Sequence, residues 1–195
     1  MKKVQISTLA ILLITAFSCK EAKKEAEETS EEVVETVEEV VATMEPQVIT
    51  FTMEPKSDSN VSGEVVFTEE DGEVIMRATF MGLDEGEHAI HLHEKADCSS
   101  DDGKSTGGHW NPTFEPHGKW GAEEGYHKGD IGNFTADSDG NATVDFSTDE
   151  WCIGCDDEKK NILGKAVIVH QGTDDFTSQP SGAAGARIAC TGIIQ

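Results

Sequence analysis

The chain has 195 residues, with 38 acidic against 15 basic side chains and a formal net charge of −23. This excess of carboxylates argues against nucleic acid or an anionic membrane surface as a partner, because both are bound through lysine and arginine. A hydrophobic fraction of 36% with 19 glycines suits a loop-rich β domain better than a helical bundle. Five of the seven histidines fall between positions 88 and 117, and that clustering needs an explanation.

Residues 1–18 have the pattern of an export signal. Lys2 and Lys3 precede an apolar run that ends at Phe17, and this run is shorter than the roughly 20 residues of a membrane-spanning helix. Cys19 follows the small residue Ser18, which resembles a bacterial lipoprotein signal, in which this cysteine carries the lipid. We expect export and a lipid anchor at Cys19 on a bacterial membrane, facing the periplasm or the cell surface. Cleavage to a freely soluble secreted form is the alternative.

Residues 19–46 form a Glu-rich segment that is nearly devoid of aromatic side chains. Its valines recur at helical spacing, but valine is a mediocre helix former. We interpret the segment as a solvated, partly helical tether that holds the next domain off a membrane. Docking of the valine stripe into the groove of a partner is the alternative.

Short alternating runs begin at residue 47, and eight of them are predicted as strands. The pairs Asp71-Gly72 and Asp139-Gly140 supply the positive φ that hairpin turns need. The expected fold of residues 47–195 is all-β, an eight-stranded antiparallel Greek-key barrel or sandwich. Two connections, about 94–130 and 170–187, are long enough to be functional loops. The expected strands are 47–54, 61–69, 73–81, 88–94, 131–137, 142–148, 162–170 and 186–194.

Histidines mark the fourth predicted strand and the end of the seventh. His91 and His93 are two positions apart, so both side chains leave the same face of a strand and form half of a transition-metal site. His170 ends the seventh strand and adds a further imidazole. His88 falls on the opposite face from His91 and His93, and we expect it to be a packed core histidine.

The first long loop carries a second set of ligand types. His109, His117, His127 and Asp130 lie within 22 positions. Three imidazoles and one carboxylate match a tetrahedral zinc site that is closed, and therefore structural, because all four positions come from the protein. A bound ion would also account for the order of so long a loop.

These segments together resemble the copper,zinc superoxide dismutase family. The motifs are HAIHLHE, GGHWNP, HKGDIGN, VIVHQGTDD and GAAGARIACTGII, and the resemblance covers nearly all of residues 47–195. It implies one copper and one zinc ion per chain, and conversion of superoxide to dioxygen and hydrogen peroxide at a copper that cycles between Cu(II) and Cu(I). The implied copper ligands are His91, His93, His109 and His170, and the implied zinc ligands are His109, His117, His127 and Asp130.

The resemblance also assigns roles around these ligands. His109 would bridge both metals as an imidazolate, leave copper on reduction and return a proton to the outgoing peroxide. Arg187 matches the family's active-site arginine, whose permanently charged guanidinium holds a small anion beside copper. Asp174 stands where the family has an aspartate that links a copper ligand to a zinc ligand through their outer ring nitrogens.

Four cysteines remain besides Cys19, and in an exported protein they are candidates for disulfides. The resemblance implies a bridge between Cys98 and Cys190 that anchors the metal loop to the barrel. Cys152 and Cys155 have no counterpart in the common family pattern. We interpret them as a local disulfide, with a redox pair or half of a zinc site as alternatives.

The rival to the enzyme is a lipoprotein on the same fold that buffers copper or zinc without turnover. Arg187 favours the enzyme, because buffering needs no anion-binding arginine. The loop before Arg187 contains no lysine, so the charge pattern that steers superoxide in the better-known animal enzymes does not carry over. Lys128 and Lys165 are candidates for that role. The resemblance implies a homodimer as one candidate assembly of this chain.

Overall fold

The computed structural model describes residues 45–195. The expected export signal, Cys19 and the tether up to residue 44 lie outside the described residues, so these expectations stay predictions. Within the unit Glu45–Gln195, no helix is long and apolar enough to cross a membrane.

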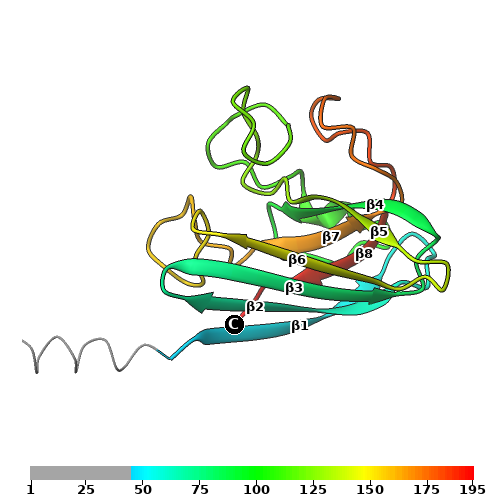
Figure 1. The fold of residues 1–195 in the computed structure, drawn as a ribbon, viewed down its shortest axis with the longest axis horizontal. Coiled ribbons are helices and arrows are strands. Elements are labelled where there is room, and N and C mark those ends of the chain that lie inside the picture. Colours follow the sequence, from blue (N-terminus) through cyan, green and yellow to red (C-terminus); the bar gives the residue numbers. More distant parts are fainter. Residues whose placement is uncertain (1–44) are drawn as a thin grey trace, which may run out of the picture. The chain divides into compact units, whose positions relative to one another are not determined.

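Eight strands form one antiparallel sheet that curls into a nearly closed barrel, as expected (Figure 1). The strand order is β5-β4-β7-β8-β1-β2-β3-β6. Strands β5 and β6, at the two ends of this order, are consecutive in the chain, and the Asp137 N–H donates to the Asn141 carbonyl at 2.9 Å in the turn between them. The strands are β1 Gln47–Pro55, β2 Ser62–Glu70, β3 Glu73–Met81, β4 Gly86–His93, β5 Gly132–Ala136, β6 Ala142–Thr148, β7 Ala166–His170 and β8 Arg187–Gly192.

The barrel interior is built by the period-two pattern of the strands. Along β3, Val74, Met76, Ala78 and Phe80 are buried, while the residues between them are exposed. The β2–β3 turn uses Asp71 and Gly72 at φ 52° and 81°, which is the positive φ that the sequence predicted there.

Strand β7 begins four residues later than predicted. Ile162–Lys165 form a turn instead, in which the Lys165 N–H donates to the Ile162 carbonyl at 3.2 Å. Gly164 has φ 81° in this turn, a conformation that a glycine tolerates and a regular strand does not contain. Ile162 remains fully buried, so its apolar character serves the core without a place in the strand.

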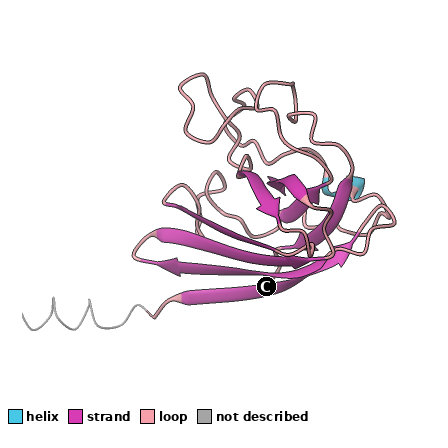
Figure 2. Ribbon diagram, turned by 45° about the vertical axis from the view of Figure 1, so that its right-hand side comes forward, coloured by secondary structure: helices cyan, strands magenta, loops and turns pink. Residues whose placement is uncertain are grey.

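Strand β4 is buried on both faces from His88 to His93. Ile90 and Leu92 belong to the barrel core, and His91 and His93, which alternate with them along the strand, therefore lie on its outer face. The two long connections rise over one side of the barrel (Figures 1 and 2). The same covering loops include the short 3₁₀ helix η1, Lys104–Thr106. Loops therefore cover the outer face of the sheet, and a site can form between this face and the loops.

His88 occupies the core face of β4, as predicted, and is 2% exposed. Its Nδ1 lies 2.9 Å from the carbonyl oxygen of His170, and its Nε2 lies 2.9 Å from that of Asp84. The ring also packs beside Phe134, with 5.9 Å between the centroids. His88 thus ties the end of β7 to the turn before β4.

Candidate metal centre

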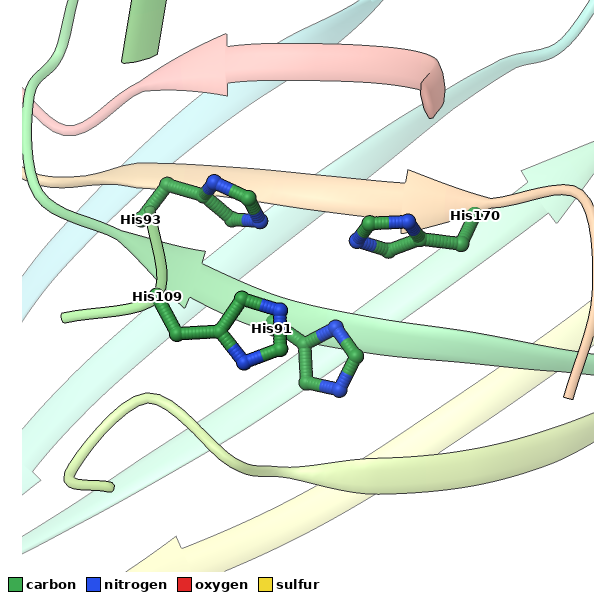
Figure 3. Close-up of side chains that lie close together, drawn as sticks. All are labelled: His91, His93, His109 and His170. Carbon is green, nitrogen blue, oxygen red and sulfur yellow. The ribbon is translucent and has the colours of Figure 1, made fainter. Parts of the chain in front are cut away.

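Four imidazoles converge on the outer face of the barrel (Figure 3). His91 and His93 come from β4 and His170 from the last position of β7, while His109 is held beside His93 by an isolated antiparallel bridge. One ring nitrogen from each of the four lies within 4.8 Å of the others. All four residues are buried, with at most 6% of each exposed. The structure thus brings together the four residues that the resemblance assigned to copper.

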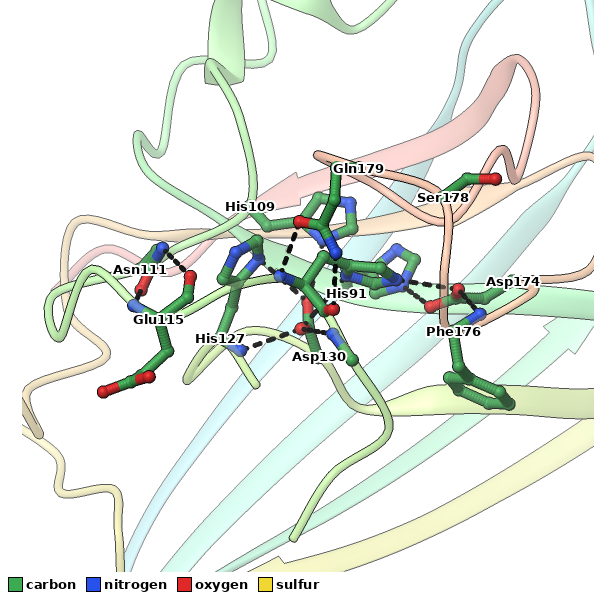
Figure 4. Close-up of polar contacts among 12 residues, drawn as sticks. His91, His109, Asn111, Glu115, His127, Asp130, Asp174, Phe176, Ser178 and Gln179 are labelled. Carbon is green, nitrogen blue, oxygen red and sulfur yellow. Dashed lines mark hydrogen bonds and ion pairs between the residues drawn. The ribbon is translucent and has the colours of Figure 1, made fainter. Parts of the chain in front are cut away.

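A second set adjoins the first and shares His109 with it (Figure 4). His109 Nδ1 lies 2.9 Å and His127 Nδ1 lies 3.2 Å from Asp130 Oδ1, and His117 Nδ1 lies 3.1 Å from Asp130 Oδ2. Ligand atoms at about 2.0–2.1 Å from a tetrahedral zinc ion are separated by roughly 3.3 Å, so these distances have the size of the edges of such a site.

The hydrogen bonds of the rings test whether metals fit this site. Every histidine of the two sets has one buried nitrogen without a hydrogen-bond partner, although buried polar atoms are normally paired. These atoms are His91 Nδ1, His93 Nε2, His109 Nε2, His117 Nδ1, His127 Nδ1 and His170 Nε2. In the copper set these nitrogens face one another, and in the zinc set those of His117 and His127 face the Asp130 carboxylate. A cation can replace the missing hydrogen-bond partners in both places, and we conclude that both sets fit a metal ion.

In four of these histidines the opposite ring nitrogen is held by an acceptor. His93 Nδ1 donates to the Gly107 carbonyl at 3.0 Å, and His170 Nδ1 lies 3.4 Å from the Gly185 carbonyl. Asp174 spans the two sets, since its Oδ2 accepts from His91 Nε2 and its Oδ1 from His117 Nε2, both at 2.9 Å. Such acceptors fix the tautomer and leave the inward nitrogen free to bind. Asp174 thus lies where the resemblance predicted.

Burial keeps the imidazoles of the copper set neutral. It lowers the pKa of His93 and of His170 well below 6.5, with the neighbouring histidines adding to the effect. It lowers the pKa of His91 as well, against the opposing influence of Asp174, and lowers the pKa of His109 to about 4. Near pH 7 these rings carry the free lone pairs that copper binding needs.

The zinc set has the opposite electrostatics. Burial disfavours a charged His117, but Asp130 and Asp174 outweigh it and raise the pKa of this ring to about 9. Burial likewise opposes ionisation of Asp130, yet the three surrounding histidines hold its pKa far below the usual value. The set therefore has an ionised carboxylate, and a positive charge in contact with it is favoured.

Two amides and one glycine that the sequence interpretation missed hold this arrangement. The Gln179 side chain accepts from the His117 N–H at 2.9 Å and donates to the His117 carbonyl at 2.8 Å. Asn133 does the same for Asp174, at 2.8 and 2.9 Å. A side chain at Gly182 would overlap the Asp174 carboxylate. Nothing in the sequence near these residues indicates the pairing, since each partner lies far away along the chain or in another loop.

Arg187 begins β8 and is the cross-strand partner of His170, at a register shift in the β7–β8 ladder. It lines a pocket of about 520 Å³ together with His93, His109 and His170. Lys104 also lines this pocket, whereas the two lysines that the sequence suggested do not. Lys128 is paired with Glu150, and Lys165 lies over the Trp110 ring at 5.5 Å. The buried imidazoles therefore border a pocket that Arg187 and Lys104 line together with Glu94 and Asp102.

Both expected disulfides are present, Cys98–Cys190 and Cys152–Cys155. The second closes a local loop, and Asn161 supports it by donating from Nδ2 to the Cys155 carbonyl at 3.0 Å. With both sulfurs in one bond, the Cys152–Cys155 pair is neither half of a zinc site nor a free dithiol.

A sequence model of the copper/zinc superoxide dismutases matches residues 61–194. The chain belongs to the copper,zinc superoxide dismutase family. A relative named Superoxide dismutase (Cu-Zn) 2, from Aquifex aeolicus, is 35% identical over 144 residues, which are 71% of this chain and 82% of the relative. The Extracellular superoxide dismutase (Cu-Zn) of Drosophila melanogaster is 36% identical over 159 residues, 76% of this chain and 84% of that protein.

Solved structures share the fold of this dismutase-family domain. A SOD-like protein from Bacillus subtilis is 28% identical, with a TM-score of 0.66, and the match covers 74% of this chain and 97% of that one. The clock protein EA4 is 31% identical, with a TM-score of 0.65, and the match covers 78% of this chain and 98% of that one. A fold does not decide an activity, whereas the residues of the site do. Membership in the family implies one copper and one zinc ion per chain, and the two ligand sets accommodate them.

Proposed function

We propose that the protein disproportionates superoxide to dioxygen and hydrogen peroxide. One observation carries the proposal: a buried set of four neutral imidazoles, whose inward nitrogens lack partners, borders a pocket that Arg187 lines. Metal storage would explain the imidazoles. It would give no role to Arg187, whose guanidinium can bind a small anion in the pocket. The comparisons support the proposal, because relatives at about 35% identity are named superoxide dismutases.

His91, His93, His109 and His170 would hold copper, and His109, His117, His127 and Asp130 would hold zinc. A copper ion held there would supply one-electron redox chemistry, so that one superoxide is oxidised to dioxygen and a second is reduced to peroxide. The zinc set is structural, since the protein provides all four of its ligands.

Other residues bind the anion and manage protons. Arg187 attracts superoxide and orients it, because its guanidinium stays charged at neutral pH and offers several donors. His109 is shared by both sets, so its Nε2 can hold a proton whenever that nitrogen is not a ligand. From there it gives one of the two protons that hydrogen peroxide requires, and water gives the other. Asp174 keeps His91 and His117 oriented throughout.

The test is superoxide consumption by the copper- and zinc-loaded protein against the variants His170→Ala and Arg187→Ala. His170→Ala should abolish turnover, because it removes a copper ligand. Arg187→Ala should lower kcat/KM about tenfold or more while copper remains bound. Arg77→Ala is the matched control, since Arg77 is exposed and pairs with Asp145 on the barrel surface, at 3.5 Å. Wild-type turnover no higher than that of His170→Ala would leave the buffering lipoprotein as the better account.

We further propose that the protein is exported and anchored by lipid at Cys19, with residues 20–46 as the tether. The support is the sequence pattern alone. Replacing Cys19 by serine should move the protein from the membrane fraction to the soluble fraction, and unchanged partitioning would refute lipidation. Homodimer formation stays a prediction. A measurement of the mass of the purified protein in solution would test it.

A further inference from the structure

A closed set of hydrogen bonds joins three polar groups: the Arg187 guanidinium, the Gly103 carbonyl and the Thr106 hydroxyl. The Arg187 NH1 group donates to the Gly103 carbonyl at 2.9 Å and lies 3.0 Å from Thr106 Oγ1. The Thr106 hydroxyl donates to the same Gly103 carbonyl at 2.9 Å. Because a hydroxyl has one proton, and this one points to Gly103, its oxygen accepts from NH1. All three bonds are therefore compatible, and both hydrogens of NH1 are used.

The surroundings leave this hydroxyl no other role in hydrogen bonding. Thr106 is fully buried at the end of η1, and its backbone N–H bonds to the Gly103 carbonyl at 3.4 Å. Gly103 has φ 68°, and a side chain there would lie 3.2 Å from Arg187 Cβ and 3.4 Å from its Cδ. The stem of Arg187 thus packs on Gly103 while one nitrogen is fixed by Thr106. The Cys98–Cys190 disulfide fastens this segment to the strand that carries Arg187.

The arrangement determines which edge of the guanidinium faces the pocket. The hydrogen bonds that the Arg187 side chain makes within the described residues both use NH1. The Nε and NH2 hydrogens remain for a ligand, and two donors on one edge fit a small anion. We infer that Thr106 is a positioning residue for the anion site: its hydroxyl sets the orientation in which Arg187 presents Nε and NH2 to an anion beside the copper ligands.

This inference rests on the proposed function, since it assumes that a small anion binds at Arg187 next to copper. An anchor that is oriented before the anion arrives binds it more tightly than one that must first be ordered. A hydroxyl at position 106 therefore matters for anion affinity, whereas the volume of the side chain matters for packing. Substitutions that separate hydroxyl from volume distinguish the two roles.

The experiment compares Thr106→Val, which keeps the branched shape and loses the hydroxyl, with Thr106→Ser, which keeps the hydroxyl and loses the methyl group. Azide is the probe, titrated into the copper- and zinc-loaded protein and followed by its copper absorption band. Thr106→Val should weaken azide binding roughly five- to tenfold and lower kcat/KM for superoxide by a similar factor. Thr106→Ser should stay within about twofold of the wild type in both, with equal metal content in all three proteins.

Two results would overturn the inference: wild-type azide affinity in Thr106→Val, or an equal loss in Thr106→Ser, which would show that the methyl group matters instead. If Thr106→Val does not fold, Thr106→Ala tests the same loss of the hydroxyl with less volume. In an Arg187→Ala background the valine change should have no further effect, because the group it positions is gone. Azide binding needs copper but no turnover, so a failure of the dismutase proposal would leave this test readable.

Discussion

At the scale of single residues, the metal centre depends on atoms that point away from the metals. The outer N–H groups of His91 and His117 donate hydrogen bonds to the Asp174 carboxylate. The backbone N–H of Asp174 in turn donates to the Asn133 side chain. If such an acceptor moves, the ring loses its tautomer preference and its orientation together. Gly182 protects this contact, because it lies against the Asp174 carboxylate at φ 65° and leaves no room for a Cβ atom.

Gly182→Ala should therefore weaken zinc binding, by about 10- to 100-fold if the loss matches that seen when outer contacts of metal ligands are removed. The new methyl group would overlap the Asp174 carboxylate and lie 2.7 Å from His117 Nε2, so one of the two must move. Competition with a chromophoric chelator measures the affinity. Gly121→Ala is the matched control, since Gly121 has φ 78° in the loop that carries His117 but no atom within 4 Å of an added Cβ. Equal losses in both variants would attribute the effect to backbone strain.

The limits of sequence interpretation are also visible at this scale. His91, His93, His109 and His170 could be found because imidazoles are uncommon and their spacing on a strand has a direct geometric meaning. Gln179, Asn133 and Thr106 could not, since amides and hydroxyls are ordinary in loops and their partners are set only when distant segments meet. The choice between Nδ1 and Nε2 at each histidine was equally inaccessible, because it depends on those partners.

At the scale of elements, the strands were predictable and their ends were not. Alternation along β3 survives in the structure because one face packs on the core and the other meets solvent. Strand β7 is buried on both faces and has no such contrast, so its sequence does not show where the strand starts, and the turn at Gly164 falls within the predicted range 162–170. The two long connections have no hydrophobic alternation that predicts their backbone path, and a disulfide, the ligand sets and the amides fix them instead.

The two disulfides should differ in their contribution to stability. Cys98 and Cys190 are 92 residues apart, whereas Cys152 and Cys155 are three apart. In the chain-entropy model, closing the first loop contributes roughly 4–5 kcal/mol and closing the second roughly 2 kcal/mol. Replacing both cysteines of each pair by serine should therefore lower the free energy of unfolding about twice as much for Cys98/Cys190, measured by denaturant unfolding of metal-free protein. Equal losses would contradict the dependence on loop length.

At the scale of the whole molecule, the question is how so acidic a protein admits an anion. Residues 47–195 carry 28 acidic and 10 basic side chains. Salt screens distant charges within about 8–10 Å, so the charges at the pocket matter most. Among the described residues, Arg187 and Lys104 are the lysine and arginine side chains that line it, against Glu94 and Asp102. Lys104 Nζ lies 2.7 Å from Asp102 Oδ2, which offsets part of its charge.

Charge changes at this pocket should therefore alter the rate of superoxide capture more than equal changes elsewhere. Asp102→Asn releases Lys104 from its partner and should raise kcat/KM about two- to fivefold at low ionic strength, whereas Lys104→Gln should lower it by a similar factor. The effects stay modest because Lys104 is largely exposed to solvent. Both should shrink as salt increases, since screening removes the attraction. Asp145→Asn is the control, because Asp145 pairs with Arg77 on the barrel surface and does not line the pocket. If it raised kcat/KM as much as Asp102→Asn, the net charge of the molecule would govern capture, and the field at the pocket would not.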